Sequence, residues 1–293
     1  MHCFDGYYAI DWSGDKNRFQ KGIKIAFLDA KNSRPKIISP LNNQKYWNRD
    51  TLIEYLKNLK SNKRYLIGFD FAFSYPFQDY ESYFFNLKKS PLTPNKLWDF
   101  IDSFNLDNKN FYGGNVWNIK IVKEYYNSPV NRGKKFQSRR RVTETFAKEI
   151  CSPSPTFNCV GPGAVGTGTL SGMRVLKFLK NDFNIWPFDS YKNNDKSIIV
   201  EIFPTLYFRK HLIKPKKNIG YTINQINEGL KKYNSLPISK EFKMFGPDQD
   251  EADAIISVAA IKYFSQNLNY WKVHKVAKKE GWIYGVKFTN DKE

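Results

Sequence analysis

The chain has 293 residues, of which 41% are hydrophobic and 17% aromatic, enough apolar material for one large domain or two small ones. Its three cysteines have no zinc-like spacing and its three histidines are scattered, so neither a zinc cluster nor a histidine-based triad is indicated. No apolar run is long enough to span a bilayer, and residues 1–5 lack the basic and apolar regions of a signal peptide. We therefore expect a cytoplasmic protein with no membrane partner.

The chain is strongly basic, with 47 Lys and Arg against 28 Asp and Glu and a formal net charge of +19. Such a charge attracts polyanions, of which nucleic acid is the usual one. Codon bias in a low-GC genome is the alternative explanation, because most basic residues are Lys and the chain is also rich in Asn, Ile, Phe and Tyr. We take nucleic acid, DNA or RNA, as the expected partner.

The N-terminal part predicts an antiparallel meander, a helix and a further strand. The meander is indicated by three apolar runs, at residues 7–12, 22–28 and 36–39. Residues 51–59 carry apolar side chains at helical spacing, with Asp50 as the expected N-cap. A fourth apolar run, at residues 65–71, predicts the next strand.

The middle of the chain has weaker periodicity. Prolines interrupt it repeatedly, and helices are predicted at residues 95–104 and 173–179. The glycine-rich stretch at 161–172 predicts a loop. We interpret residues 75–190 as an insertion or lid within a single domain that spans residues 1–293.

Regular elements return toward the C-terminal end. Residues 197–203 predict a fifth strand, closed by Pro204. Helices are predicted at 206–212, 223–232 and 250–264, with Asp248 and Glu251 as the capping residues of the last one. Residues 281–286 predict a short final strand or a packed tail. The whole pattern predicts an α/β fold whose mixed five-stranded sheet is flanked by helices.

Acidic residues occur in apolar surroundings. Asp11, Asp70 and Glu201 each lie in a predicted strand, and Asp250 and Asp253 open the last long helix. A lone carboxylate in such surroundings is costly unless a cation or a hydrogen-bond network holds it. If the three strands are neighbours, their acids converge at one sheet edge, while the two helix acids share a helix face. Carboxylate oxygens suit Mg²⁺ or Mn²⁺, so the sequence predicts a divalent-metal site.

Each acid also has a simpler explanation. Asp11 could cap the turn that Ser13 and Gly14 make, and Asp70 could pair with a buried Lys or Arg. Asp250 is favoured by the helix dipole whether or not it binds a metal, whereas Asp253 lies deeper and is the better ligand. Glu201, with apolar neighbours on both sides in the sequence, is the most distinctive acid of the strands.

The stretch at residues 161–166 matches G-x-G-x-x-G, but Pro162 and the further glycines disfavour a helix opening there, so a dinucleotide fold is rejected. Gly161 and Gly163 belong either to a plain loop or to one whose amides approach a phosphate. The densest basic run contains Lys134, Lys135, Arg139, Arg140 and Arg141. It is either a solvated face or a contact for a nucleic-acid backbone.

The order of these motifs resembles a domain-of-unknown-function family of predicted nucleases with an RNase H-like fold. The resemblance is carried by residues 9–14, 68–70 with Pro76, 157–179, 200–204, 250–254 and 281–283. It implies an RNase H-like mixed sheet of five strands, three antiparallel and then parallel ones, flanked by helices, with a large insertion after strand four.

The chain is also similar, more distantly, to Holliday-junction resolvases, whose sites use an acid on strand one, an acid on strand four and a D-x-x-D helix. This similarity implies Asp11, Asp70, Asp250 and Asp253 as metal ligands. Glu201 departs from the resolvase pattern, and it is either a ligand or a group that orients a metal-bound water.

The leading hypothesis is a nuclease that uses Mg²⁺ or Mn²⁺ and whose catalytic residues are Asp11, Asp70, Glu201 and Asp253. One alternative is an ATP-binding phosphotransferase-like protein of the related actin and sugar-kinase fold, although the chain is short for the two domains that such proteins need. Another is a catalytically inactive nucleic-acid-binding module.

Overall fold

The computed structural model describes residues 4–59, 62–107, 109–190, 196–238 and 249–289. Six strands form one mixed sheet in the order β3-β2-β1-β4-β6-β5. β1 pairs antiparallel with β2, as does β2 with β3, whereas β1, β4, β6 and β5 run parallel to one another. The strands are β1 (Gly6–Asp11), β2 (Lys24–Asp29), β3 (Lys36–Ile38), β4 (Tyr65–Phe69), β5 (Asn184–Ile185) and β6 (Ile198–Glu201).

The structure confirms the mixed α/β fold with helices flanking a mixed sheet, but the predicted count of five strands is wrong. The additional strand, β5, has two residues and pairs with β6 at the sheet edge. Two residues are too few to produce the alternation from which a strand is predicted, so this strand left no signal in the sequence.

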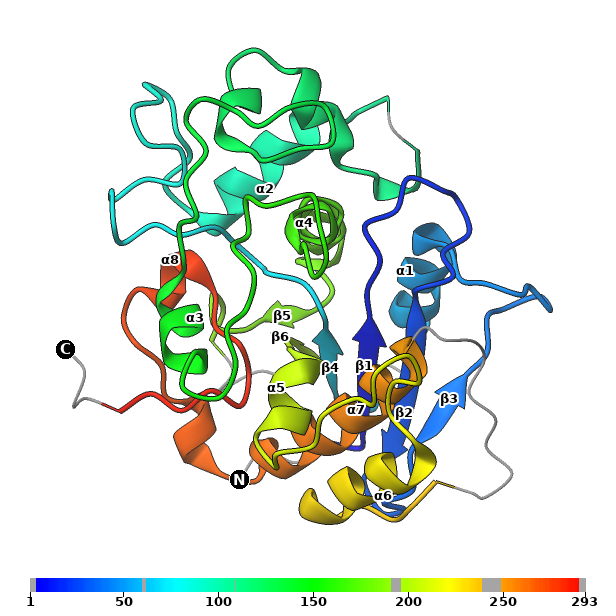
Figure 1. Ribbon diagram of the computed structural model, residues 1–293. Coiled ribbons are helices and arrows are strands. Elements are labelled where there is room, and N and C mark those ends of the chain that lie inside the picture. Colours follow the sequence, from blue (N-terminus) through cyan, green and yellow to red (C-terminus); the bar gives the residue numbers. More distant parts are fainter. Residues whose placement is uncertain (1–3, 60–61, 108, 191–195, 239–248, 290–293) are drawn as a thin grey trace.

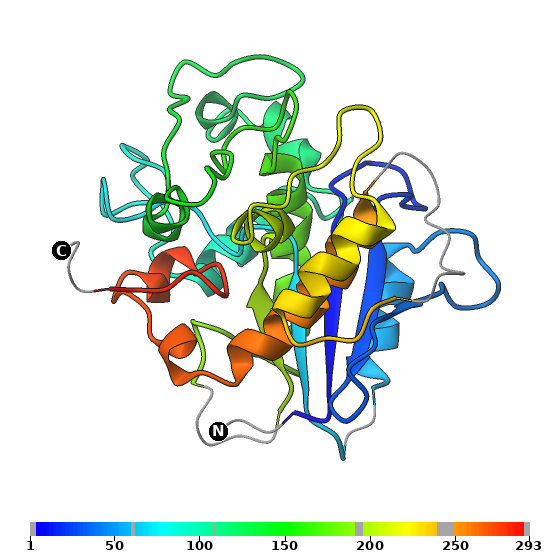
Figure 2. The same cartoon turned by 60° about the horizontal axis from the view of Figure 1, so that its bottom comes forward.

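Helices cover both faces of the sheet (Figure 1). On β1, Tyr7 and Ala9 pack into one apolar cluster and Tyr8 and Ile10 into another, because successive strand side chains point to opposite faces. The first cluster includes α5 (Pro204–Arg209), α6 (Ile223–Lys232) and α7 (Asp250–Ser265). Figure 2 shows α7, in orange, and α6, in yellow, lying across the blue strands.

The opposite face is covered by α1 (Arg49–Lys57), α2 (Pro94–Ser103) and α4 (Gly166–Leu179). Residues between β4 and β6 therefore supply two of the helices on this face. Shorter elements complete the described part of the chain: α3 (Val142–Ala147), α8 (Ala277–Glu280) and 3-10 turns at Lys109–Phe111, Gly114–Asn118, Lys123–Tyr125 and Leu268–Trp271.

Helix α4 corrects the prediction of a glycine-rich loop followed by a short helix. It begins at Gly166, seven residues earlier than expected, and includes Gly168 and Gly172. A Cβ on Gly172 would lie 2.2 Å from the Phe71 ring. This glycine therefore serves close packing of the helix on the chain that follows β4.

Other helix ends also differ from the predictions. Asn48, not Asp50, caps α1, since its side chain accepts a hydrogen bond of 2.8 Å from the Thr51 amide. Glu251 forms an ion pair of 3.1 Å with Lys24, while Asp248 lies outside the described residues, so the predicted capping pair stays a prediction. α5 occupies 204–209 instead of 206–212.

The segment at 281–286 is a packed tail that makes a single bridge, between Ile283 and Glu201. Within the described ranges of the chain, every helix is too short or too polar to cross a bilayer.

Candidate functional site

Two carboxyl groups meet where β1 and β4 end. Asp11 is the last residue of β1 and Asp70 directly follows β4. These strands are parallel neighbours, with Ile10 beside Phe69, and the Asp70 amide donates a 3.0 Å hydrogen bond to the Ile10 carbonyl. The two carboxyl groups lie close enough for each to affect the pKa of the other.

Two further acids reach this edge from the first turn of α7. This helix packs on β1 and β2, on the face to which Ala9, two residues before Asp11, also points. Its first turn contains Asp250 and Asp253. The charges of both act on Asp11, so the structure brings four of the predicted site residues within electrostatic reach of one another.

Burial and mutual repulsion disfavour the charged forms of these acids. Burial, together with the charges of Asp70, Asp253 and Asp250, raises the pKa of Asp11 well above its usual range. Burial and the charges of Asp70 and Asp250 likewise raise the pKa of Asp253. Burial raises the pKa of Asp70 to about 7. The neighbouring Asp11 carboxyl group opposes this shift, whereas the charges of Glu201 and Asp250 add to it.

Three of these acids are not paired with a basic side chain of the described part of the chain. None of the ion pairs there involves Asp11, Asp70 or Asp253. Lys24 lies opposite Asp11 on β2 but pairs with Glu251. Within the described residues, Asp11, Asp70 and Asp253 therefore concentrate negative charge without an ion-pair partner.

The donor set is suited to a hard divalent cation, because carboxylate oxygens are the ligands that Mg²⁺ and Mn²⁺ prefer. Among the described residues, however, no group of three or more His, Cys, Asp or Glu side chains has the spacing of a metal site. The acids are near enough to repel one another, and a bound cation would relieve that repulsion.

Glu201 acts on Asp70 through its charge but is itself paired with Arg141, so its role as a catalytic acid or ligand stays a prediction. It ends β6, next to Phe69 of β4, but the strand alternation turns it toward the face opposite Val200. Arg141 donates to both of its carboxylate oxygens, at 2.5 and 2.7 Å. The Phe73 amide donates a third hydrogen bond, of 3.1 Å.

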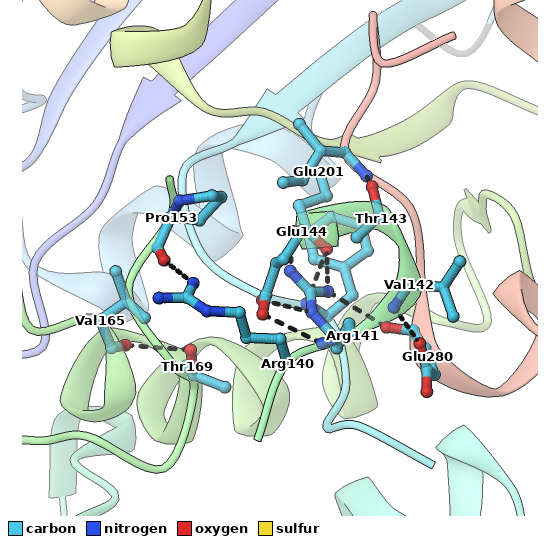
Figure 3. A network of polar contacts seen from close by, with 12 residues as sticks. Arg140, Arg141, Val142, Thr143, Glu144, Pro153, Val165, Thr169, Glu201 and Glu280 are labelled. Carbon is cyan, nitrogen blue, oxygen red and sulfur yellow. Dashed lines mark hydrogen bonds and ion pairs between the residues drawn. The ribbon is translucent and has the colours of Figure 1, made fainter. Parts of the chain in front are cut away.

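Arg141 lies at the centre of a buried network (Figure 3). Its Nε donates to Glu144 at 2.8 Å and a terminal nitrogen donates to the Glu280 carbonyl at 3.1 Å. Burial lowers the pKa of Arg141, but the charges of Glu201 and Glu144 outweigh burial and raise it. The guanidinium therefore stays charged and fully used within the protein.

The Glu280 side chain extends this network to the chain that follows β4. Its carboxylate accepts hydrogen bonds from the amides of Phe77, Gln78 and Val142, at 2.6 to 2.8 Å. No motif in the sequence indicated that Glu280 would meet Arg141 and Glu144, because it lies in a separate segment, whereas Arg141 and Glu144 are three residues apart at the start of α3.

The basic run predicted to contact nucleic acid divides into inward and outward members. Arg139 is buried and donates hydrogen bonds to Asp79 and to three backbone carbonyls. Arg139 and Arg141 both point into the protein, so the prediction that they contact nucleic acid is wrong. Arg140 donates to the Pro153 carbonyl. Lys134 and Lys135 remain exposed.

A cleft of about 850 Å³ is lined by Asp70, the member of the acid group that reaches it. Asp70 and Glu201 line it on the sheet side, and the start of α4 lines it on another. Gly161 and Gly163 lie in the exposed loop before α4 with positive φ angles of 89° and 70°, and Gly163 borders the cleft. A Cβ on Gly14 would lie 2.4 Å from the Gly168 nitrogen, so only glycine lets the loop after β1 approach α4 this closely.

The acid cluster predicts a pH dependence for the metal-free protein. The folded state holds a proton on Asp70 up to about pH 7, whereas an unfolded Asp loses it near about pH 4. The resulting stability, about 4 kcal/mol, is fully present below about pH 4 and lost as the pH rises through about 7. Urea unfolding in EDTA across this range measures the loss. Asp70→Asn should make the loss smaller but not abolish it, because the pKa values of Asp11 and Asp253 are raised as well. A stability that rises over this window would contradict the assignment.

Comparison with known proteins adds no relative. A scan against protein-family models, a search of curated proteins and a search of solved structures each found no match. The family resemblance seen in the sequence motifs therefore remains a prediction, and the functional argument depends on the geometry of the site.

Proposed function

We propose that this chain is a divalent-metal-dependent nuclease built on an RNase H-like core. The sheet order β3-β2-β1-β4-β6, antiparallel over the first three strands and parallel after them, supports the core, with β5 as an edge addition. Acids at the ends of β1 and β4 and at the start of α7 support the site. The observation that carries the proposal is the convergence of mutually repelling carboxylates, three of which, Asp11, Asp70 and Asp253, form no ion pair with the described residues.

The metal would be held by Asp11, Asp70 and Asp253, with Asp250 completing the set. Bound Mg²⁺ or Mn²⁺ supplies positive charge that activates a water and stabilises the leaving oxygen of a phosphodiester. The protein side chains determine where that positive charge is held. Asp11 and Asp70 are fixed by the paired ends of two strands, which are more rigid supports than loops.

Glu201 and Arg141 support the site without entering it. Glu201 accepts a hydrogen bond from the amide of Phe73, three residues after Asp70. Arg141 neutralises the charge of Glu201. We assign them the role of fixing the chain that carries Asp70. With Arg141 in place, Glu201 holds this chain without leaving an unpaired buried charge beside the acids.

The proposed substrate is nucleic acid, on the strength of the +19 net charge and the phosphodiester chemistry that such a site supports. Lys134 and Lys135 are the exposed members of the basic run and are the proposed backbone contacts of that segment. Phosphate contacts of this kind give affinity and position without reading sequence.

The proposal predicts that Mg²⁺ or Mn²⁺ both stabilises the protein and supports cleavage. Cation binding at one hundred times its Kd adds about 2.7 kcal/mol, which raises the melting temperature by several degrees. Differential scanning fluorimetry at pH 7.5 in EDTA and in excess Mg²⁺ measures the first effect. Gel assays with DNA and RNA oligonucleotides measure the second.

Potassium chloride of matched ionic strength is the control, because it screens the acids without coordinating them. Cleavage that persists in EDTA, or a melting temperature that responds equally to both salts, would contradict the proposal.

A further inference from the structure

Aromatic side chains form much of the cleft wall beside Asp70. The described lining residues include Trp12, Phe71, Tyr112, Trp117 and Phe203. Tyr112 and Phe203 are half-buried, so each presents part of its ring to the cleft. This wall offers apolar, flat surface next to the proposed metal ligands.

The position of the Trp12 ring is fixed. Its Nε1 donates a 2.9 Å hydrogen bond to the Ser171 hydroxyl on α4. The Phe71 ring lies 5.1 Å from it and the Arg49 guanidinium 5.5 Å from it. A ring held in this way loses little conformational entropy when a flat ligand packs against it.

The charge of the cleft differs from the charge of the whole protein. The described residues that line it contain four acids, Asp15, Asp70, Glu144 and Glu201, and two cations, Lys16 and Arg141. Arg141 is already bonded to Glu144 and Glu201. An extended phosphate backbone would be repelled by these acids except where a bound cation offsets their charge, although the molecule carries +19 overall. The cleft therefore favours the bases of a strand over its phosphates.

The size of the cleft also limits what enters it. A volume of about 850 Å³ falls within the range of roughly 300–1,000 Å³ typical of pockets for single small ligands. A base in a duplex is stacked and paired, and it reaches such a pocket only after leaving the stack. Aromatic side chains beside the path of a strand are typical of sites that bind unpaired nucleic acid.

We propose that the cleft binds one or two unpaired nucleotides, with a base packed on the aromatic wall and the scissile phosphate beside Asp70. This inference rests on the proposed nuclease function and adds its substrate class, single-stranded or locally unpaired nucleic acid instead of a continuous duplex. Tyr112 then acts as a substrate-contacting residue that carries no part of the chemistry.

The test compares kcat/KM for a short oligonucleotide, as DNA and as RNA, alone and annealed to its complement, at one fixed salt concentration. We expect the single strand to be preferred by at least about tenfold. Tyr112→Ala should lower kcat/KM for the single strand by roughly 5- to 150-fold, mainly through KM, while Tyr112→Phe retains it. Tyr46→Ala is the matched control, since Tyr46 is a half-buried tyrosine that does not line the cleft.

A second variant, at an exposed position, tests the cleft without the risk that activity is lost through unfolding. Val130 is 64% exposed and borders the cleft. Val130→Glu should therefore lower kcat/KM for the single strand without unfolding the protein. Ile121→Glu, at a 51% exposed position outside the cleft, is its control. Equal rates on single strand and duplex, or equal losses on both in Tyr112→Ala, would overturn the inference and leave the nuclease intact. No metal-dependent cleavage of any substrate would overturn the proposed function itself.

Discussion

Asp11→Asn is expected to abolish metal-dependent cleavage while leaving the protein at least as stable as the unmodified chain in EDTA. Loss of one ligand charge removes several kcal/mol of electrostatic stabilisation, which corresponds to a rate loss of about 10³-fold or more. The same change relieves the repulsion that Asp11 experiences from Asp70, Asp253 and Asp250. Cleavage rates and urea unfolding at pH 7.5 measure the two effects.

The opposite signs distinguish a functional acid from a structural one. Asp29 is the control, because it also ends a strand but accepts hydrogen bonds from the Lys31 and Asn32 amides, which lower its pKa. Asp29→Asn should therefore cost some stability and leave cleavage unchanged. If Asp11→Asn unfolds the protein as well, Asp11 is a structural residue and the proposed site is wrong.

Arg141→Met is expected to destabilise the fold by about 3–5 kcal/mol, the largest stability effect that the structure predicts. Methionine fills most of the same space but leaves the buried carboxylates of Glu201 and Glu144 without their counterion. Urea unfolding at pH 7.5 gives the difference. Cleavage should fall too, because the chain after Asp70 loses its support.

Two further variants make this prediction specific. Arg132→Met removes an exposed arginine from the same region and should change stability by no more than about 0.5 kcal/mol. Adding Glu201→Gln to Arg141→Met should recover part of the loss, because it removes one unpaired buried charge. A cost below about 1 kcal/mol for Arg141→Met would show that the network contributes little.

Much of the sheet could be predicted because its central strands are nearly continuous apolar runs. β1, β4 and β6 are covered by helices on both faces, which selects such runs. The long α7 was predicted almost to its last residue for a similar reason, since it is apolar over most of its surface. Acids that interrupt these runs were conspicuous, so Asp11, Asp70 and Asp253 could be selected from the sequence.

The same apolar runs concealed the role of Glu201. A strand covered on both faces has no polar alternation, so the sequence does not show which face a given residue takes. Its partner, Arg141, is 60 positions away and stood in a basic run that was predicted to contact a nucleic-acid backbone. Burial of that arginine is a product of tertiary packing, which no local pattern reports.

The distances along the chain that the Arg141 network bridges also bear on how the molecule is assembled. The Glu280 carboxylate meets the Phe77 amide across 203 positions, and its carbonyl meets Arg141 across 139. Loops of this length close at an entropic cost that must be met before the contacts form, and high contact order slows folding. On the ribosome, β1 and β4 emerge long before Glu280. The amides of the chain after β4 that bond to Glu280 therefore lack this partner until the C-terminal segment is synthesised.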